Sequence, residues 1–121
     1  MNLAGLRVLL VEDEPIVRDI AAAGMRRRGM IVEEVTKGEE ALKWLDWPPD
    51  VLFTDIRLPG SFDGFEVARL FRRRHPKLLV VYSTAYVYTD VPVEGSLFFQ
   101  KPYDLNDVLT GIAGMTGRGF A

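Results

Sequence analysis

The chain has 121 residues, of which 48% are hydrophobic and 26% charged, and its formal net charge is −2. This length and composition suit one globular domain with a hydrophobic core, and the slight negative charge argues against direct nucleic-acid binding. The absence of cysteine and the single histidine exclude disulfides, thiol catalysis and histidine-rich metal sites. No apolar stretch approaches the ~18 residues of a membrane span, and no signal peptide is visible, so we expect a cytoplasmic protein without a membrane partner.

Short apolar runs along the chain predict five β-strands, since strands buried on both faces are almost wholly apolar. They cover residues 6–11, 31–35, 51–54, 79–83 and 97–100. Helical patterns follow four of them: from Pro15 to the residue before Gly29, over residues 38–45, over residues 64–74, and from about Asp104 onward. For the first helix we expect a core-facing side made of Ile16, Ile20, Ala23 and Met25.

The connection between the fourth and fifth strands differs from the others. Its sequence AYVYTDVPVEGS contains Pro92, and proline in a helix interior costs ~3 kcal/mol, so we expect a loop or one helical turn. The alternation of strands and helices predicts parallel pairing with right-handed crossovers. Glu33 and Glu34 suit an edge strand. The predicted fold class is α/β: a doubly wound five-stranded parallel sheet, order 2-1-3-4-5, with helices on both faces and the fourth helix short or absent.

Charged residues follow three of the predicted strands. Glu12 and Asp13 come after the first strand, Asp55 after the third and Lys101 after the fifth. Ligands of open α/β sheets bind beyond the carboxyl ends of the strands, where these side chains would meet. Carboxylate oxygens suit Mg²⁺ (or Mn²⁺), and an acidic cluster without a cation would repel itself. The pattern therefore predicts a site for a divalent metal and a phosphoryl group.

Asp55 is placed to act as a nucleophile toward phosphorus, because a carboxylate can form an acyl phosphate. The metal and Lys101 would offset charge on the transferring oxygens. Ser83 and Thr84 bring hydroxyl groups to the same rim, and the small Ala85 leaves room for a phosphoryl group.

The segments VLLVEDEP, DVLFTDIRLPG, DGFEV, VVYSTAY and FFQKPYDLNDVL, in this order and spacing, resemble the receiver domain of two-component response regulators. The resemblance covers nearly the whole chain, and the chain is similar to the stand-alone, chemotaxis-regulator-like members of the family. It implies a single receiver domain over residues 1–121. It also implies that Asp55 is the phosphoacceptor, that Asp13 ligates Mg²⁺ directly, and that Glu12 acts through water.

The same resemblance assigns further roles. Arg57 would give its backbone carbonyl to the metal, Thr84 would hydrogen-bond the phosphoryl group, and Lys101 would pair with it. Phe98 matches an aromatic switch position whose rotamer would follow Thr84. The Lys101–Pro102 peptide bond is usually cis in this family.

Three departures from the family pattern stand out. The segment from Thr84 to Lys101 is several residues short, so the output face would be rebuilt from Tyr86, Val87, Tyr88 and Val91. The loop PGSFDG is one residue longer than usual. Arg57 and Tyr86 lie two residues after Asp55 and Thr84, flank the phosphoryl site, and could slow loss of the phosphoryl group.

The predicted function is a phosphorylation-activated switch of a two-component phosphorelay. It would accept a phosphoryl group from a histidine kinase or histidine phosphotransfer protein and then bind an unknown downstream protein. We expect self-catalysed phosphoryl transfer and autodephosphorylation but no other enzyme activity. The alternatives are an unphosphorylated pseudo-receiver that serves as a binding platform, a metal-dependent aspartyl phosphatase, and a flavin- or nucleotide-binding module. The phosphatase would need two aspartates two residues apart where Glu12-Asp13-Glu14 stand, and the nucleotide module would need a glycine-rich loop there.

Overall fold

The protein is described by a computed structural model that covers residues 2–86 and 91–118. Its elements are β1 (Arg7–Val11), α1 (Pro15–Arg27), β2 (Ile31–Val35), α2 (Gly38–Leu42), β3 (Val51–Asp55), α3 (Gly64–Arg74), β4 (Leu79–Thr84), β5 (Leu97–Gln100) and α4 (Leu105–Met115). All strand pairs are parallel, in the order β2-β1-β3-β4-β5. The predicted fold class is confirmed, with β2 at an edge. None of the helices in these ranges has the length and apolar character required to cross a membrane.

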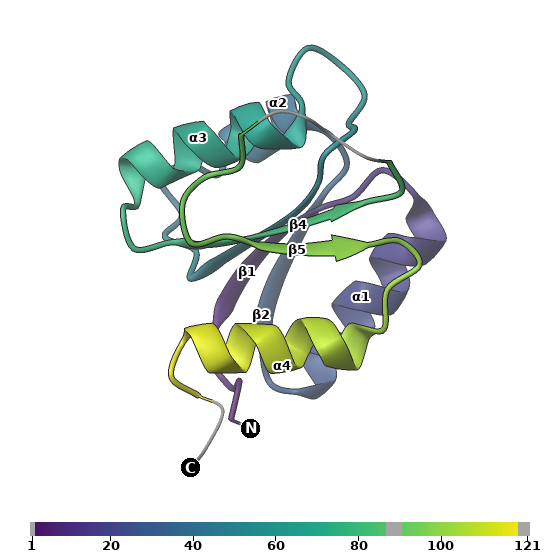
Figure 1. Ribbon diagram of the computed structural model, residues 1–121, viewed down its shortest axis with the longest axis vertical. Coiled ribbons are helices and arrows are strands. Elements are labelled where there is room, and N and C mark those ends of the chain that lie inside the picture. Colours follow the sequence, from purple (N-terminus) through teal and green to yellow (C-terminus); the bar gives the residue numbers. More distant parts are fainter. Residues whose placement is uncertain (1, 87–90, 119–121) are drawn as a thin grey trace.

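The sheet separates two hydrophobic cores because successive strand residues point to opposite faces. Figure 1 shows α1 and α4 on one side of the sheet and α2 and α3 on the other. On β1, Val8 and Leu10 belong to the α1/α4 core, whereas Leu9 and Val11 belong to the α2/α3 core. Strands buried on both faces leave polar residues only at their ends, which places the charged residues at one edge of the sheet.

Helix α1 buries a different face from the one predicted. Ile16 and Ile20 are 74% and 62% exposed, and Ala23 is also exposed, so that prediction is wrong except for Met25. The buried residues are Ala21, Ala22, Gly24 and Met25. Small side chains let the helix lie close to the sheet and to α4, and the two isoleucines therefore flank the contact and face outward.

The other helices begin and end for identifiable local reasons. Asp63 and Glu66 form a capping box at the start of α3, in which each side chain accepts a hydrogen bond from the other's backbone N–H. Asp104 caps α4, as predicted, by accepting from the amide of Asn106. Helix α2 ends at Leu42, earlier than predicted, because the chain tightens into turns with i→i−3 hydrogen bonds.

The connection between β4 and β5 contains no helix in residues 85–86 and 91–96. The predicted output residues Val87 and Tyr88 lie outside the described residues. The backbone N–H of Val93 donates to Tyr82 Oη at 3.2 Å, and Arg72 Nη1 donates to the carbonyl of Glu94 at 2.7 Å. Val93 and Glu94 are therefore tied to β4 and α3.

Candidate functional site

Three carboxylates meet at the carboxyl edge of the sheet. Glu12 and Asp13 directly follow β1, and Asp55 ends β3, the neighbouring strand. Each of these side chains places a carboxylate oxygen within 4.8 Å of the others. Glu12 and Asp55 are buried, at 3% and 7% exposure, whereas Asp13 is exposed. The cluster is a set of hard oxygen donors that is open to solvent on one side, which suits a divalent cation such as Mg²⁺.

Lys101, just after β5, reaches into this cluster. Its Nζ lies 2.7 Å from Glu12 Oε1, 2.9 Å from Asp55 Oδ2 and 3.3 Å from Glu14 Oε1. The backbone N–H of Lys101 donates to the carbonyl of Thr84 at 2.8 Å, and the Lys101–Pro102 bond is cis, as the resemblance implied. One ammonium group thus faces three carboxylates directly.

The site is electrostatically unbalanced in favour of negative charge. Burial raises the pKa of Glu12 and of Asp55 above their ordinary values, although hydrogen bonds from Lys101 oppose the shift. Burial would lower the pKa of Lys101, but its hydrogen bonds with Glu12 and Asp55 outweigh this and raise it. Burial and the nearby Glu12 carboxylate raise the pKa of Tyr103 to about 12. A further cation would offset the electrostatic repulsion between the carboxylates, so the donor set fits a bound metal.

Gly64 allows α3 to approach the phosphoacceptor candidate closely. A Cβ at this position would lie 2.2 Å from the carbonyl oxygen of Asp55 and 2.8 Å from Cα of Ile56. The Gly64 amide instead donates to the carbonyl of Ile56 at 2.7 Å. The loop after β3 can therefore return onto the strand end only because residue 64 has no side chain.

A cleft of about 400 Å³ opens over Asp55. It is lined by Asp13, Glu14, Asp55, Arg57, Leu58, Pro59, Ala85, Tyr86 and Lys101. The Arg57 guanidinium lies over the Tyr86 ring, with Cζ 5.1 Å from the ring centroid, and both side chains are exposed. This cation–π pair joins the two sides of the cleft.

Thr84 and Phe98 lie beside the cleft and do not line it. Thr84 is buried, and its Oγ1 accepts a hydrogen bond from the amide of Tyr86 at 3.1 Å. Phe98 is 48% exposed, and its ring centroid lies 5.7 Å from that of Tyr82. Phe98 therefore faces outward in the structure, on β5 and three residues before Lys101.

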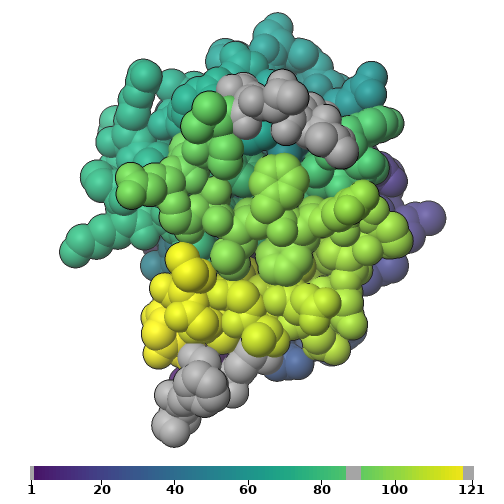
Figure 2. All heavy atoms as spheres, viewed as in Figure 1, coloured from purple at the N-terminus to yellow at the C-terminus, as the bar shows by residue number. Residues whose placement is uncertain are grey.

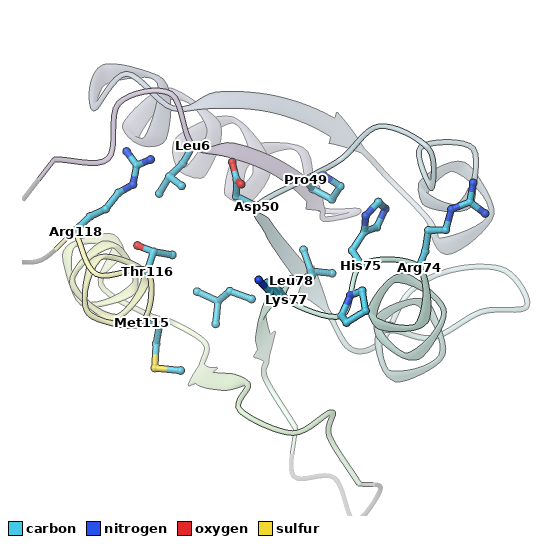
Figure 3. A pocket seen from close by; sticks show the side chains of 12 residues that line it. Leu6, Pro49, Asp50, Arg74, His75, Lys77, Leu78, Met115, Thr116 and Arg118 are labelled. Carbon is cyan, nitrogen blue, oxygen red and sulfur yellow. The ribbon is translucent and has the colours of Figure 1, made fainter.

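A second cavity, of about 630 Å³, lies at the opposite edge of the sheet. Figure 3 shows it between α3 and α4, where Leu6, Asp50 and Leu78 mark the beginnings of β1, β3 and β4. None of the carboxylates at the strand ends lines it. The chemistry-bearing residues thus belong to the smaller cleft at the carboxyl edge.

Two contributors to the site were not predicted from the sequence. Glu14 lines the cleft and reaches Lys101, and its place in the run EDE next to two other acidic residues was an available signal. Gly64 carries no functional group, and only the three-dimensional closeness of α3 to Asp55 reveals what it does.

The comparisons with known proteins agree with this geometry. The chain matches the family described as response regulator receiver domain over residues 8–113. The chain belongs to this family. Its members are phosphorylation-activated switches of two-component signalling, and the present receiver domain is one of them. The resemblance read from the sequence is confirmed at the level of the family.

This receiver domain is similar in sequence to bacterial regulatory proteins and in structure to another receiver protein. The transcriptional regulatory protein TcrA of Mycobacterium tuberculosis is 29% identical over 98% of this chain and 49% of its own length. The sensory transduction protein LytT of Bacillus subtilis is 36% identical over 82% of this chain and 43% of its own. A response regulator receiver protein from Sinorhizobium medicae superposes with a TM-score of 0.85 and 25% identity, over 96% of this chain and 98% of the other. The chain spans about half the length or less of these curated relatives.

Proposed function

We propose that this receiver domain accepts a phosphoryl group on Asp55 and that the resulting charge at the strand ends changes its affinity for a partner protein. The observation that carries the proposal is the grouping of Glu12, Asp13 and Asp55 within 4.8 Å, with Lys101 bonded to Asp55. A buried carboxylate that faces an open cleft is accessible to a phosphorus atom but not to bulk water on every side.

In the proposed reaction, a carboxylate oxygen of Asp55 attacks the phosphorus of a phosphohistidine. A P–O bond forms, the P–N bond breaks, and the histidine nitrogen takes up a proton. Lys101 Nζ, now 2.9 Å from Oδ2, would pair with the phosphoryl oxygens. The Thr84 hydroxyl accepts from the Tyr86 amide and does not line the cleft, so it would move toward the phosphoryl group before donating its hydrogen to it.

The metal would be held by Asp13 and Asp55, with the backbone carbonyl of Arg57 as a further ligand and Glu12 acting through water. A bound Mg²⁺ or Mn²⁺ would offset negative charge on the phosphoryl oxygens. The grouping of carboxylate oxygens from Glu12, Asp13 and Asp55 within 4.8 Å supports a cation in the working site. We propose no enzyme activity beyond self-catalysed phosphoryl transfer and autodephosphorylation.

The proposed phosphodonor is a histidine kinase or histidine phosphotransfer protein. Next to the cleft lies an apolar hollow of about 520 Å³ that shares Glu14, Ala85 and Lys101 with it. Its other lining residues are Val17, Ile20, Ala21, Pro102, Tyr103 and Leu105. The outward-facing Ile20 of α1 thus lies where a helical donor could dock and bring its histidine to Asp55. A cytoplasmic location, and an unidentified protein as the downstream partner, stay predictions.

We propose that Arg57 and Tyr86 slow loss of the phosphoryl group. Their stacked side chains line the cleft and would obstruct a water molecule that approaches the acyl phosphate. The variants Arg57→Ala and Tyr86→Ala should each dephosphorylate faster than the parent. Unchanged rates in both variants would refute this role.

The proposal is tested with Mg²⁺ and beryllofluoride, a phosphoryl mimic. We expect Mg²⁺ to raise the melting temperature, and beryllofluoride to raise it further only when Mg²⁺ is present. Asp55→Asn should abolish the beryllofluoride effect. A pseudo-receiver would show no beryllofluoride effect in the parent protein, and that outcome would replace the proposed switch by a binding platform.

A further inference from the structure

In the part of the chain that the structure describes, no helix covers the face of β5 that carries Phe98. Leu97 and Phe99 pack against the α1/α4 core, whereas Phe98 points to the α3 side, contacts Tyr82 and is 48% exposed. Strands β1, β2, β3 and β5 each lead into a helix, whereas the connection that follows β4 contains none in residues 85–86 and 91–96. Figure 1 shows β5 at the near edge of the sheet, between the levels of α3 and α4.

A groove of about 590 Å³ lies between α3 and residues 91–94 on this side. Arg69, Arg72 and Arg73 form its α3 wall, and Val91, Pro92, Val93 and Glu94 form the other wall. Val91 is 75% exposed. The hydrogen bond from Arg72 to the Glu94 carbonyl joins the two walls, and the bond from the Val93 amide to Tyr82 ties the second wall to β4. The groove is thus formed before any partner binds.

The charge of the groove is opposite to that of the whole chain. Among its described lining residues the groove has three arginines and one carboxylate, Glu94, in a protein whose net charge is −2. Arg74, the next residue on α3, pairs with Asp46 outside the groove. A concentration of positive charge beside exposed apolar side chains is complementary to a surface that is both acidic and apolar.

We propose that this groove and the adjacent Phe98 form a docking site for an acidic, amphipathic helix of a partner protein. The apolar stripe of the helix would cover Phe98 and Val91, and carboxylates on its flank would reach Arg69, Arg72 and Arg73. A helix fits because helices cover the rest of the sheet. A groove binds an amphipathic helix through contacts with helix residues spaced at i, i+3, i+4 and i+7. This goes beyond the proposed function because it states the chemistry of a partner.

The test uses a synthetic, fluorescently labelled peptide of about 18 residues, or five helical turns, with leucines at i, i+3, i+4 and i+7 and glutamates beside them. Fluorescence anisotropy measures its binding to the whole chain, and amide chemical shifts locate it. We expect binding that weakens with added salt, with shifts at residues 69–73 and 91–98. Two control peptides, one with the same composition in scrambled order and one with lysine in place of glutamate, should bind at least about tenfold more weakly.

Matched variants separate the groove from the rest of the surface. Arg73→Glu should weaken binding at least about tenfold, whereas Arg28→Glu, the same charge change at the end of α1, should alter it by less than about twofold. Phe98→Ala should weaken binding by a similar factor, and Ile31→Ala, an exposed apolar residue at the other edge of the sheet, should not. Arg73→Glu should leave Mg²⁺-dependent phosphorylation unchanged, so a failure of this proposal is distinguishable from a failure of the phosphoryl site.

Several results would overturn the proposal. These are equal binding of the scrambled peptide, an unchanged affinity in Arg73→Glu, or shifts confined to α1 and α4. The same holds if duplex DNA or anionic vesicles bind in an Arg73-dependent manner while the peptide does not. A concentration-dependent dimer that Phe98→Glu dissociates, and that the peptide does not displace, would assign the surface to a second copy of the chain. Figure 2 shows that the side chains around β5 lie on the visible face of the molecule, above α4.

Discussion

Replacing Lys101 by methionine tests the electrostatic account of the site. The ammonium group bridges Glu12 and Asp55 at 2.7 and 2.9 Å, and the three side chains are only 11%, 4% and 9% exposed. Removing one partner of a buried charge pair costs about 3–5 kcal/mol because the remaining charge is left uncompensated. Protonation of a carboxylate and burial of the methionine side chain offset part of this cost, so we expect Lys101→Met to lose about 3 kcal/mol of unfolding free energy in metal-free buffer.

The same variant should respond more strongly to metal. With the ammonium group gone, the carboxylates bind Mg²⁺ with less competition, so saturating Mg²⁺ should stabilise Lys101→Met by at least about 1.4 kcal/mol more than the parent, a tenfold difference in binding constant. Urea unfolding with and without Mg²⁺ measures both quantities, and Lys77→Met, which removes an exposed lysine, is the control. A loss below about 0.5 kcal/mol in metal-free buffer, comparable to an ordinary surface substitution, would refute the reasoning.

Three further predictions follow from other parts of the structure. Gly64→Ala should destabilise the fold by about 1–3 kcal/mol and slow phosphorylation, because the added Cβ would collide with the Asp55 carbonyl. The control is Gly114→Ala, whose Cβ would meet nothing within 4 Å and which should be neutral or stabilising. Similar unfolding curves for the two variants would contradict this. The pKa values of Asp55 and Glu12 are raised, so protons compete with Mg²⁺ for these carboxylates. On acidification, the Mg²⁺ affinity measured by calorimetry should therefore begin to fall at a pH above the ordinary carboxyl pKa values of 3.8 and 4.5. An affinity that stays constant down to those pH values would contradict this prediction. Ile20→Glu should slow phosphoryl transfer from a histidine phosphotransfer protein but not from a small phosphodonor, and equal slowing of both would argue against docking on the hollow beside α1.

The sheet and the position of the charged residues at its carboxyl edge were predictable because both depend on short-range sequence signals. Buried parallel strands are continuous apolar runs, and a charged residue directly after such a run must lie at the carboxyl edge. Asp55 and Lys101 are 46 residues apart in sequence, yet the strand order alone predicts that they meet, and they do so at 2.9 Å.

What was not predictable depends on distances between elements. The face of α1 was wrongly assigned because the larger apolar residues, Ile16 and Ile20, were expected inside, whereas the close helix packing is made mostly by small residues such as Ala21, with Met25. The collision that Gly64 avoids is likewise invisible in the sequence. The groove beside α3 lies between that helix and residues 91–94, and the sequence predicted the loop but not the wall of arginines that it faces.

The most direct test of the central claim is the intact mass of the protein after incubation with a small-molecule phosphodonor. We predict that one phosphoryl group is added in the presence of Mg²⁺, that chelation of the metal prevents the addition, and that Asp55→Asn remains unmodified. No mass change in the parent protein with Mg²⁺, or an equal change in Asp55→Asn, would contradict the assignment of Asp55 as the phosphoacceptor.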